Sequence, residues 1–155
     1  MNVYNIILWG FAATIVLTTI MAVAKPLGWS RMDIPFLLGT MFTANRNKAP
    51  LIGFAAHVGI GWIFAFIYGA VFESIGYHTW WVGLIIGFIH GSFVLSGGLQ
   101  IVSTFHPRMA HTYTGPTPTR QLEPPGLFAL NYGAGTPLVT LIAHLIYGII
   151  LGLFY

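Results

Sequence analysis

Long apolar runs separated by short polar segments dominate the hydrophobic pattern of this 155-residue chain. Four of the runs are long enough for a helix to cross about 30 Å of hydrocarbon at roughly 1.5 Å per residue. They cover residues 6–24, 51–72, 80–101 and 138–155. The pattern predicts an all-α protein, in which residues 1–155 form a single transmembrane domain built as a four-helix bundle.

The polar connections differ in length and content. The middle connection is a short turn over residues 73–79, whereas the other two each contain a short apolar patch, over residues 34–42 and 126–132. We expect both patches to form short helices along the membrane surface. Asp33 is placed to cap the first of them, with a proline tolerated in its opening turn. The rest of the long connection over residues 106–136 is rich in Pro, Thr and Gly, which predicts a loop or lid.

Composition supports the membrane class. Hydrophobic residues make up 56% of the chain and charged residues 6%, and the mean hydropathy is +0.79, far from the values of a soluble domain. The absence of cysteine excludes disulfides and thiolate-ligated metals or iron–sulfur clusters. The net charge of +3 comes from residues spread over the connections. Because they form no basic stripe, we expect no nucleic-acid partner.

The positions of the positive charges predict an orientation. All Lys and Arg residues lie in the first and third connections, and none lies in the middle one. Connections rich in Lys and Arg face the cytoplasm in most membrane proteins. We therefore expect both of these connections on the cytoplasmic side and both chain termini outside the cytoplasm.

One apolar helix occurs twice in the sequence. Residues 50–68 recur 87 positions further on as residues 137–155, with seven of nineteen positions identical, among them the pair His57 and His144. Two spans separate the copies, so both helices cross the membrane in the same direction. This predicts a parallel repeat of two helical hairpins, related by a pseudo-two-fold axis along the membrane normal.

Three histidines inside the predicted spans are the candidate binding residues. His57 and His144 each lie seven residues after a proline at the expected helix start, which places both about 10 Å below the cytoplasmic boundary. His90 lies about one helical turn deeper. The faces that carry the repeated pair also carry small residues, among them Gly61 and Gly148. Such stripes permit close helix packing, and they also leave room for a flat macrocycle.

The side chains available restrict the chemistry of this site. The only acidic residues, Asp33, Glu73 and Glu123, lie in connections, which argues against a carboxylate di-iron centre and against carboxylate-based cation transport. Imidazole alone suits haem iron, a magnesium chlorin, copper or zinc. We expect haem b or a chlorin held by the repeated pair, in a subunit for electron transfer or in an accessory subunit of a larger complex. A metal ion held by all three histidines is the second interpretation.

Other interpretations stay open. The histidines also suit a pathway for protons or a metal ion, or a purely structural or lipid-contacting subunit. A weaker metal-binding set, His106, Met109 and His111, lies in the third connection and would suit copper. The chain has no phosphate-binding glycine loop, serine elbow or HExxH motif, so catalysis by this chain alone is not expected. Expected partners are membrane lipids and either other membrane subunits or further copies of the chain.

A resemblance is carried by four segments that follow the first span: MDIPFLLGTMF, AHVGIGWIFAFIYGAVFE, GFIHG and LNYGAGTPLVTLIAHLIYGIILGLFY. Together they resemble a group of small bacterial four-helix inner-membrane proteins of unknown function. The likeness extends over nearly the whole chain. It implies a bacterial inner-membrane location and four spans, but no activity and no functional residue.

Overall fold

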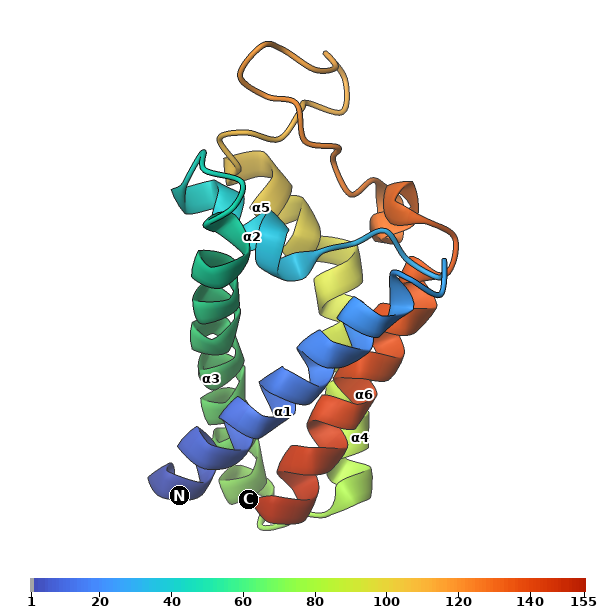
Figure 1. The fold of residues 1–155 in the computed structure, drawn as a ribbon. Coiled ribbons are helices and arrows are strands. Elements are labelled where there is room, and N and C mark those ends of the chain that lie inside the picture. Colours follow the sequence, from blue (N-terminus) through green and yellow to red (C-terminus); the bar gives the residue numbers. More distant parts are fainter. Residues whose placement is uncertain (1) are drawn as a thin grey trace.

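The computed structural model describes residues 2–155, and over that range it is helical without any strand (Figure 1). Four stretches of helix are long and apolar enough to cross a membrane, which supports the predicted multi-pass membrane class. They are α1 (Val3–Ala24), α3 (Ala49–Ile75), the run formed by α4 (Trp80–Phe93), η1 (Val94–Gly98) and α5 (Leu99–Phe105), and α6 (Thr136–Phe154).

Helix α2 (Ile34–Phe42) covers the residues for which the sequence predicted a short helix. The Asp33 side chain accepts a hydrogen bond of 3.0 Å from the Phe36 N–H, and Pro35 lies in the first turn. These are the cap and the opening expected from the sequence. Helix α2 packs against α3, and a methyl group on Gly53 would collide with the Pro35 carbonyl. The short helix is therefore part of the packed bundle rather than a separate surface element.

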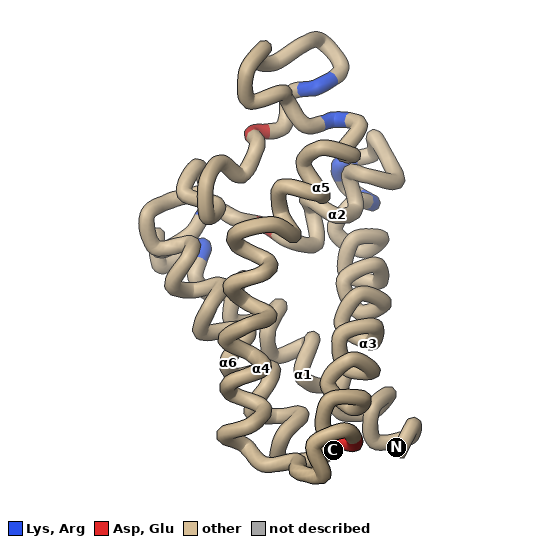
Figure 2. The backbone as a smooth tube through the Cα atoms, turned by 180° about the vertical axis from the view of Figure 1, so that it is seen from behind, with Lys and Arg blue, Asp and Glu red and all other residues tan. Residues whose placement is uncertain are grey.

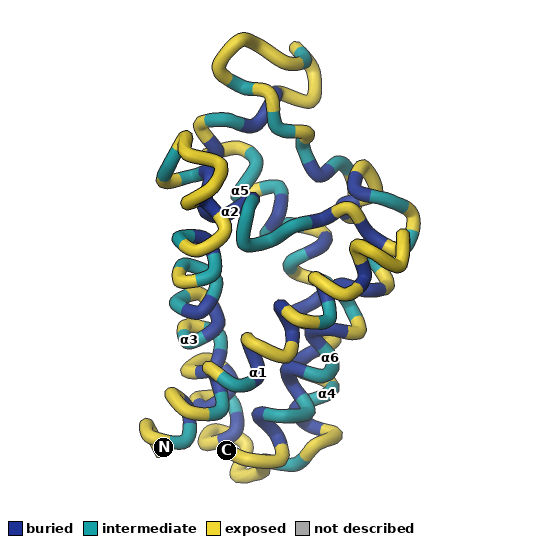
Figure 3. Tube along the Cα trace, in the orientation of Figure 1, coloured by how far each residue is buried: buried dark blue, intermediate teal, exposed yellow. Residues whose placement is uncertain are grey.

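The ends of the molecule differ in charge. Both termini lie at one end, where the Asn5 side chain donates a 2.7 Å hydrogen bond to the Tyr155 carbonyl (Figure 1). The Lys and Arg residues lie at the opposite end (Figure 2). Between the two ends, buried residues follow the inward faces of the helices, while much of the 106–126 loop is exposed (Figure 3).

Helices α4 and α6 form the closest contact in the bundle. A methyl group on Gly83 would collide with the Gly148 carbonyl, and one on Gly152 would collide with the Thr79 carbonyl. The two backbones therefore touch directly. Contact between small residues is a principal source of helix association inside membranes, where apolar burial contributes little. Helix α1 crosses over α6 and α3, whereas α3 does not pack along α4.

The third span contains an irregular turn that the sequence pattern did not predict. Over Val94–Gly98 the helix widens to π geometry, and the Leu99 N–H donates to the Val94 carbonyl, five residues back. Such turns occur mostly as single insertions in α-helices, often beside functional sites. The adjacent glycines Gly97 and Gly98 were the available signal.

The segment at 126–132, for which a surface helix was predicted, is a tighter and more strained structure. It contains η2 (Leu127–Tyr132), a 3₁₀ helix interrupted by two left-handed residues, Phe128 (φ 51°) and Ala129 (φ 61°). Ala129 is fully buried, and the Tyr132 carbonyl accepts a 2.7 Å hydrogen bond from the Arg31 N–H. Consecutive left-handed residues other than glycine are uncommon and persist only when surrounding contacts enforce them.

Candidate functional site, a histidine-lined cavity

The helices enclose a cavity of about 270 Å³. Its wall comes from α1, α3, the α4–α5 run and α6, and α2 contributes Ile34, Leu37 and Leu38. The three histidines of the predicted spans, His57, His90 and His144, all line this cavity. Most of the remaining lining is aliphatic or aromatic. The structure thus brings the three candidate residues to one enclosed, apolar space.

Hydrogen bonding fixes the tautomer of His57. Its Nδ1 lies 3.0 Å from the Thr18 hydroxyl oxygen. The single hydrogen of that hydroxyl is donated to the Thr14 carbonyl, at 2.7 Å, so the hydroxyl oxygen accepts from His57. His57 therefore carries a proton on Nδ1, and in the neutral form that the apolar lining favours it carries a lone pair on Nε2. Within residues 2–155 no hydrogen-bond partner occupies that Nε2.

His144 reaches the same state by a different contact. Its Nδ1 lies 2.7 Å from the Thr140 carbonyl, one turn earlier in α6. Because a carbonyl only accepts hydrogen bonds, Nδ1 carries a proton. The apolar surroundings favour the neutral imidazole, in which Nε2 then carries the lone pair. The His144 Nε2 also has no partner among the described residues, and the side chain is buried. Two of the three imidazoles are thus neutral donors at Nδ1 with a free lone pair at Nε2.

His90 sits among aromatic rings. It stacks on Phe64 with ring centroids 3.7 Å apart, and its edge meets His144 at 4.6 Å. The Tyr68 hydroxyl lies 3.4 Å from its Nδ1. Next to this cluster the Tyr147 hydroxyl donates a 2.6 Å hydrogen bond to the Gly61 carbonyl of α3. His90 is therefore held by ring packing more than by strong hydrogen bonds.

The cavity opens sideways, between α3 and the α4–α5 run. Three of its lining residues, Ile60, Phe93 and Ile101, are also exposed on the outer surface, by 37%, 47% and 53%. The backbones of α3 and α4 stand apart and these helices meet through side chains, such as Phe64 on His90, so we infer that the three exposed residues border an opening. In a spanning bundle this opening faces lipid. We call these three residues the lateral portal.

The two glycines predicted beside the histidines lie in different surroundings. Gly61 lines the cavity, where its Cα faces the Thr14 side chain of α1. Gly148 lies instead against Gly83 in the contact between α4 and α6. Sequence reasoning missed Thr14, which lines the cavity, and Thr18, which contacts His57. Their four-residue spacing in an apolar span was the available signal.

No ready-made metal cluster accompanies the cavity. Within residues 2–155, no group of three or more His, Cys, Asp or Glu side chains is placed to hold a metal ion. The three-histidine metal site therefore stays a prediction without a preformed ligand set. The lining of the cavity contains no charged side chain, so no observation singles out an ion or proton pathway either.

The weaker set in the loop is occupied by structural contacts. His106 is fully buried, its Nδ1 accepts a 3.1 Å bond from the Arg108 N–H, and its Nε2 donates to the Leu37 carbonyl at 3.0 Å. Burial lowers the pKa of His106 below its ordinary value, with Arg108 and Arg120 acting in the same direction. Met109 is buried while His111 is exposed. His106 thus has no free lone pair, and it joins the loop to α2.

Comparisons of the chain with family models, with curated proteins and with solved structures found no match. The resemblance to small bacterial inner-membrane proteins therefore stays a prediction. The site has to be interpreted from its own geometry.

Proposed function

We propose that this protein is a small membrane subunit that binds haem b, or a chlorin, through the Nε2 atoms of His57 and His144. One observation carries the proposal. Both imidazoles line the same cavity, and an oxygen acceptor holds the Nδ1 proton of each. Histidines that ligate metals almost always donate their other N–H to a carbonyl, carboxylate or water, which orients the ring and raises the basicity of the ligating nitrogen.

Charge balance favours a tetrapyrrole over a bare metal ion. The lining of the cavity has no acidic side chain, so a divalent cation held only by imidazoles would keep its full charge in an apolar surrounding. A tetrapyrrole dianion brings two negative charges of its own and cancels those of the metal. Imidazole ligands and an apolar wall then suffice.

The lateral portal affects how a haem or chlorin would fit the cavity. The volume of about 270 Å³ lies slightly below the usual range of roughly 300–1,000 Å³ for small-molecule sites. A macrocycle would therefore extend its edge between α3 and the α4–α5 run, where the portal side chains already face outward. The chain would orient both imidazoles and exclude water. A bound haem would supply one-electron transfer.

We also propose a location and partners. The Lys and Arg residues lie at the end opposite the termini, which supports an orientation with that end in the cytoplasm and both termini outside it (Figure 2). The bacterial inner membrane is the proposed location. Large apolar side chains are exposed along the outer faces of α3 and α4. They provide surface for lipids, for other subunits of a larger complex or for further copies of the chain.

The test is the absorption spectrum of protein purified from cells with abundant haem. We expect a Soret band that is lost in His57→Ala and in His144→Ala and retained in His78→Ala, which removes an exposed histidine in the turn between the second and third spans. A colourless, folded wild-type protein would contradict the proposal.

A matched pair of threonines separates ligation from a structural role. Thr18 and Thr19 both donate to a carbonyl four residues earlier, but only Thr18 also contacts His57. Thr18→Val should therefore reduce haem content or shift the Soret band, while Thr19→Val should do neither. If the histidines only hold helices together, His57→Asn would assemble normally and neither threonine would matter to any pigment.

A further inference from the structure

A second hollow lies at the charged end of the molecule, away from the histidine cavity. It has a volume of about 490 Å³ and lies between the α2–α3 connection and the long loop. Its lining includes Thr40, Arg46, Arg108 and Gln121. Arg46 comes three residues before α3 begins, and Arg108 three residues after α5 ends. We call this hollow the arginine groove.

The arginine groove carries positive charge that the chain does not balance. The ion pairs among residues 2–155 at this end of the molecule are Lys25 with Asp33 and Arg31 with Glu123. The remaining acidic residue of the chain, Glu73, belongs to α3 near the end that holds the termini (Figure 2). Among residues 2–155, the Lys and Arg side chains without an acidic partner are Arg46, Lys48, Arg108 and Arg120. The loops on either side of the groove supply all four.

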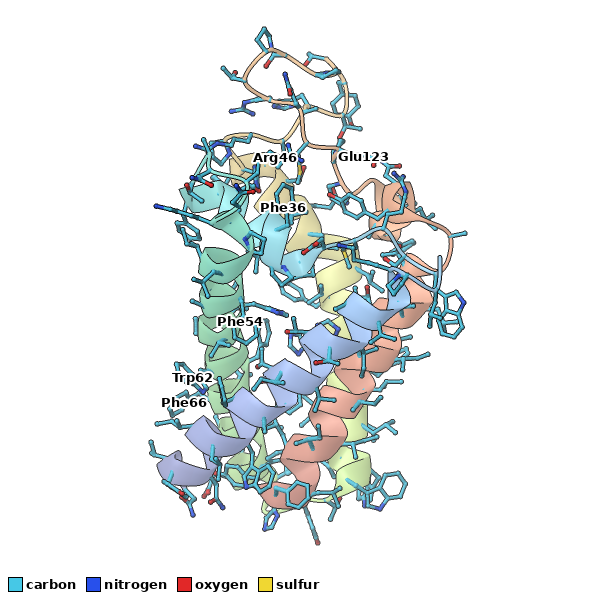
Figure 4. All side chains as sticks on the ribbon, viewed as in Figure 1. Phe36, Arg46, Phe54, Trp62, Phe66 and Glu123 are labelled. Atoms are coloured by element: carbon cyan, nitrogen blue, oxygen red, sulfur yellow. The ribbon has the colours of Figure 1, made fainter. Side chains whose placement is uncertain are left out.

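Arg46 and Arg108 are both held in place by contacts that leave guanidinium N–H donors unused. One N–H of Arg108 donates to the Thr40 carbonyl. The Arg46 guanidinium lies over the Phe36 ring, 5.0 Å from its centroid, in the region that Figure 4 labels. A guanidinium has five N–H donors, so each contact leaves several free. A guanidinium held in place in this way can donate two parallel hydrogen bonds to the oxygens of a phosphate group.

We propose that the arginine groove binds the phosphate of an anionic phospholipid. The depth of the groove supports this choice over a soluble phosphate. Arg46 and Arg108 each lie only three residues outside an apolar helix, α3 and α5 respectively, at the end of the bundle where the headgroup layer begins. Phe42 and Phe105, which are 68% and 75% exposed, lie two residues along the chain from the lining residues Ala44 and Pro107. They offer apolar surface for acyl chains, which a free phosphate would not use.

The test measures lipid binding to the full chain in detergent by native mass spectrometry, with phosphatidylglycerol and phosphatidylcholine as probes. We expect a preference of about tenfold or more for phosphatidylglycerol, because each Lys or Arg near an anionic lipid adds about 1 kcal/mol of attraction. Arg46→Gln combined with Arg108→Gln should abolish the preference. Arg31→Gln, which removes a paired arginine elsewhere at the same end, should leave it intact.

Two further measurements keep the outcome decisive. Arg108→Lys keeps the charge and a donor for the Thr40 carbonyl but loses the planar guanidinium, so its preference for phosphatidylglycerol should be weaker but still present. This variant tests the proposal if the double variant fails to fold. Inorganic phosphate at millimolar concentration should not compete with phosphatidylglycerol. Equal lipid preference in the double variant and the wild type would overturn the proposal. So would phosphate binding that depends on both arginines without any lipid preference.

Discussion

Helices α3 and α6 carry the repeated segments, yet the bundle holds them in different ways. On α6, Gly148 lies against the backbone of α4 at Gly83. On α3, the equivalent Gly61 faces the side chain of Thr14, and its carbonyl accepts the Tyr147 hydroxyl. Against the other spans, one copy is thus held by contact between backbones and the other by contacts through side chains. The backbone contact of α3 is instead with the short helix α2, at Gly53.

The difference explains where the cavity lies. Helices in direct backbone contact leave no space between them, whereas α3 stands away from α4 and is joined to the rest by α1, α2 and individual side chains. The cavity and its lateral portal occupy this looser side. Similar sequence has therefore not produced similar packing, and the pseudo-two-fold symmetry inferred from the repeat stays a prediction.

The largest effect should come from filling the tight seam. In Gly148→Ala the new methyl group meets the Gly83 carbonyl, a backbone atom that cannot rotate away. We expect a loss of about 1–3 kcal/mol or more in the free energy of unfolding, the usual range for overpacking. Denaturation of the purified protein in detergent, followed by circular dichroism, measures it. Gly61→Ala on the α3 side should cost less, because a threonine side chain is the group displaced. An equal loss in the free energy of unfolding for Gly148→Ala and Gly61→Ala would contradict the proposed difference between α6 and α3.

Acid should loosen the α3 side through His106. Its folded pKa lies below the unfolded value of about 6.5, so its contribution to stability is fully present above pH 6.5. That contribution is lost progressively as the pH falls below about 6.5, because the unfolded chain then binds the proton more readily. We expect the stability difference between wild type and His106→Asn to shrink from pH 7.5 to pH 5.5. Thermal denaturation of both proteins at several pH values measures it, and a constant difference would show that His106 does not titrate with unfolding.

Removing one polar link should have a smaller effect. Tyr147→Phe deletes the hydrogen bond from α6 to the Gly61 carbonyl while keeping the ring. Polar contacts between membrane helices contribute about 0.6 kcal/mol on average and up to about 1.7 kcal/mol. We expect a loss within that range, measured by denaturation in detergent. Hydrogen exchange of the α3 amides should increase more than that of the α6 amides, and the opposite order would contradict the side-chain account of α3.

The smallest effect, of opposite sign, is expected at Gly59. A methyl group there meets no atom within 4 Å, so Gly59→Ala adds helix propensity without a collision. The gain should be about 0.5–1 kcal/mol in the free energy of unfolding. Any marked loss of stability would show that α3 has a neighbour at this position, such as another copy of the chain.

Much of the fold followed from local sequence. The four spans and α2 depend on the length of apolar runs, on Asp33 as a cap and on prolines at helix starts, all of which act within a few residues. The π turn at Val94–Gly98 and the left-handed pair Phe128 and Ala129 did not follow. The left-handed pair lies in a segment held by a residue distant in sequence, Arg31, and hydropathy carries no information about either backbone irregularity.

The part of the site that depends on local sequence could also be predicted. Equal depth and shared small-residue faces pointed to His57 and His144, because helix geometry relates sequence position to height. The contact of His57 with Thr18 depends on how α1 crosses α3, which no local pattern specifies. Likewise, nothing near His106 in sequence indicated that its Nε2 would be engaged by the Leu37 carbonyl.

The most direct test of the central claim is low-temperature electron paramagnetic resonance of the oxidised protein, purified natively. Two neutral imidazoles that bind one iron through Nε2 predict a low-spin, six-coordinate ferric signal. The same account predicts conversion to a high-spin or five-coordinate signal in His144→Ala. A haem-containing wild-type protein without the low-spin signal, or with an identical signal in the variant, would contradict it.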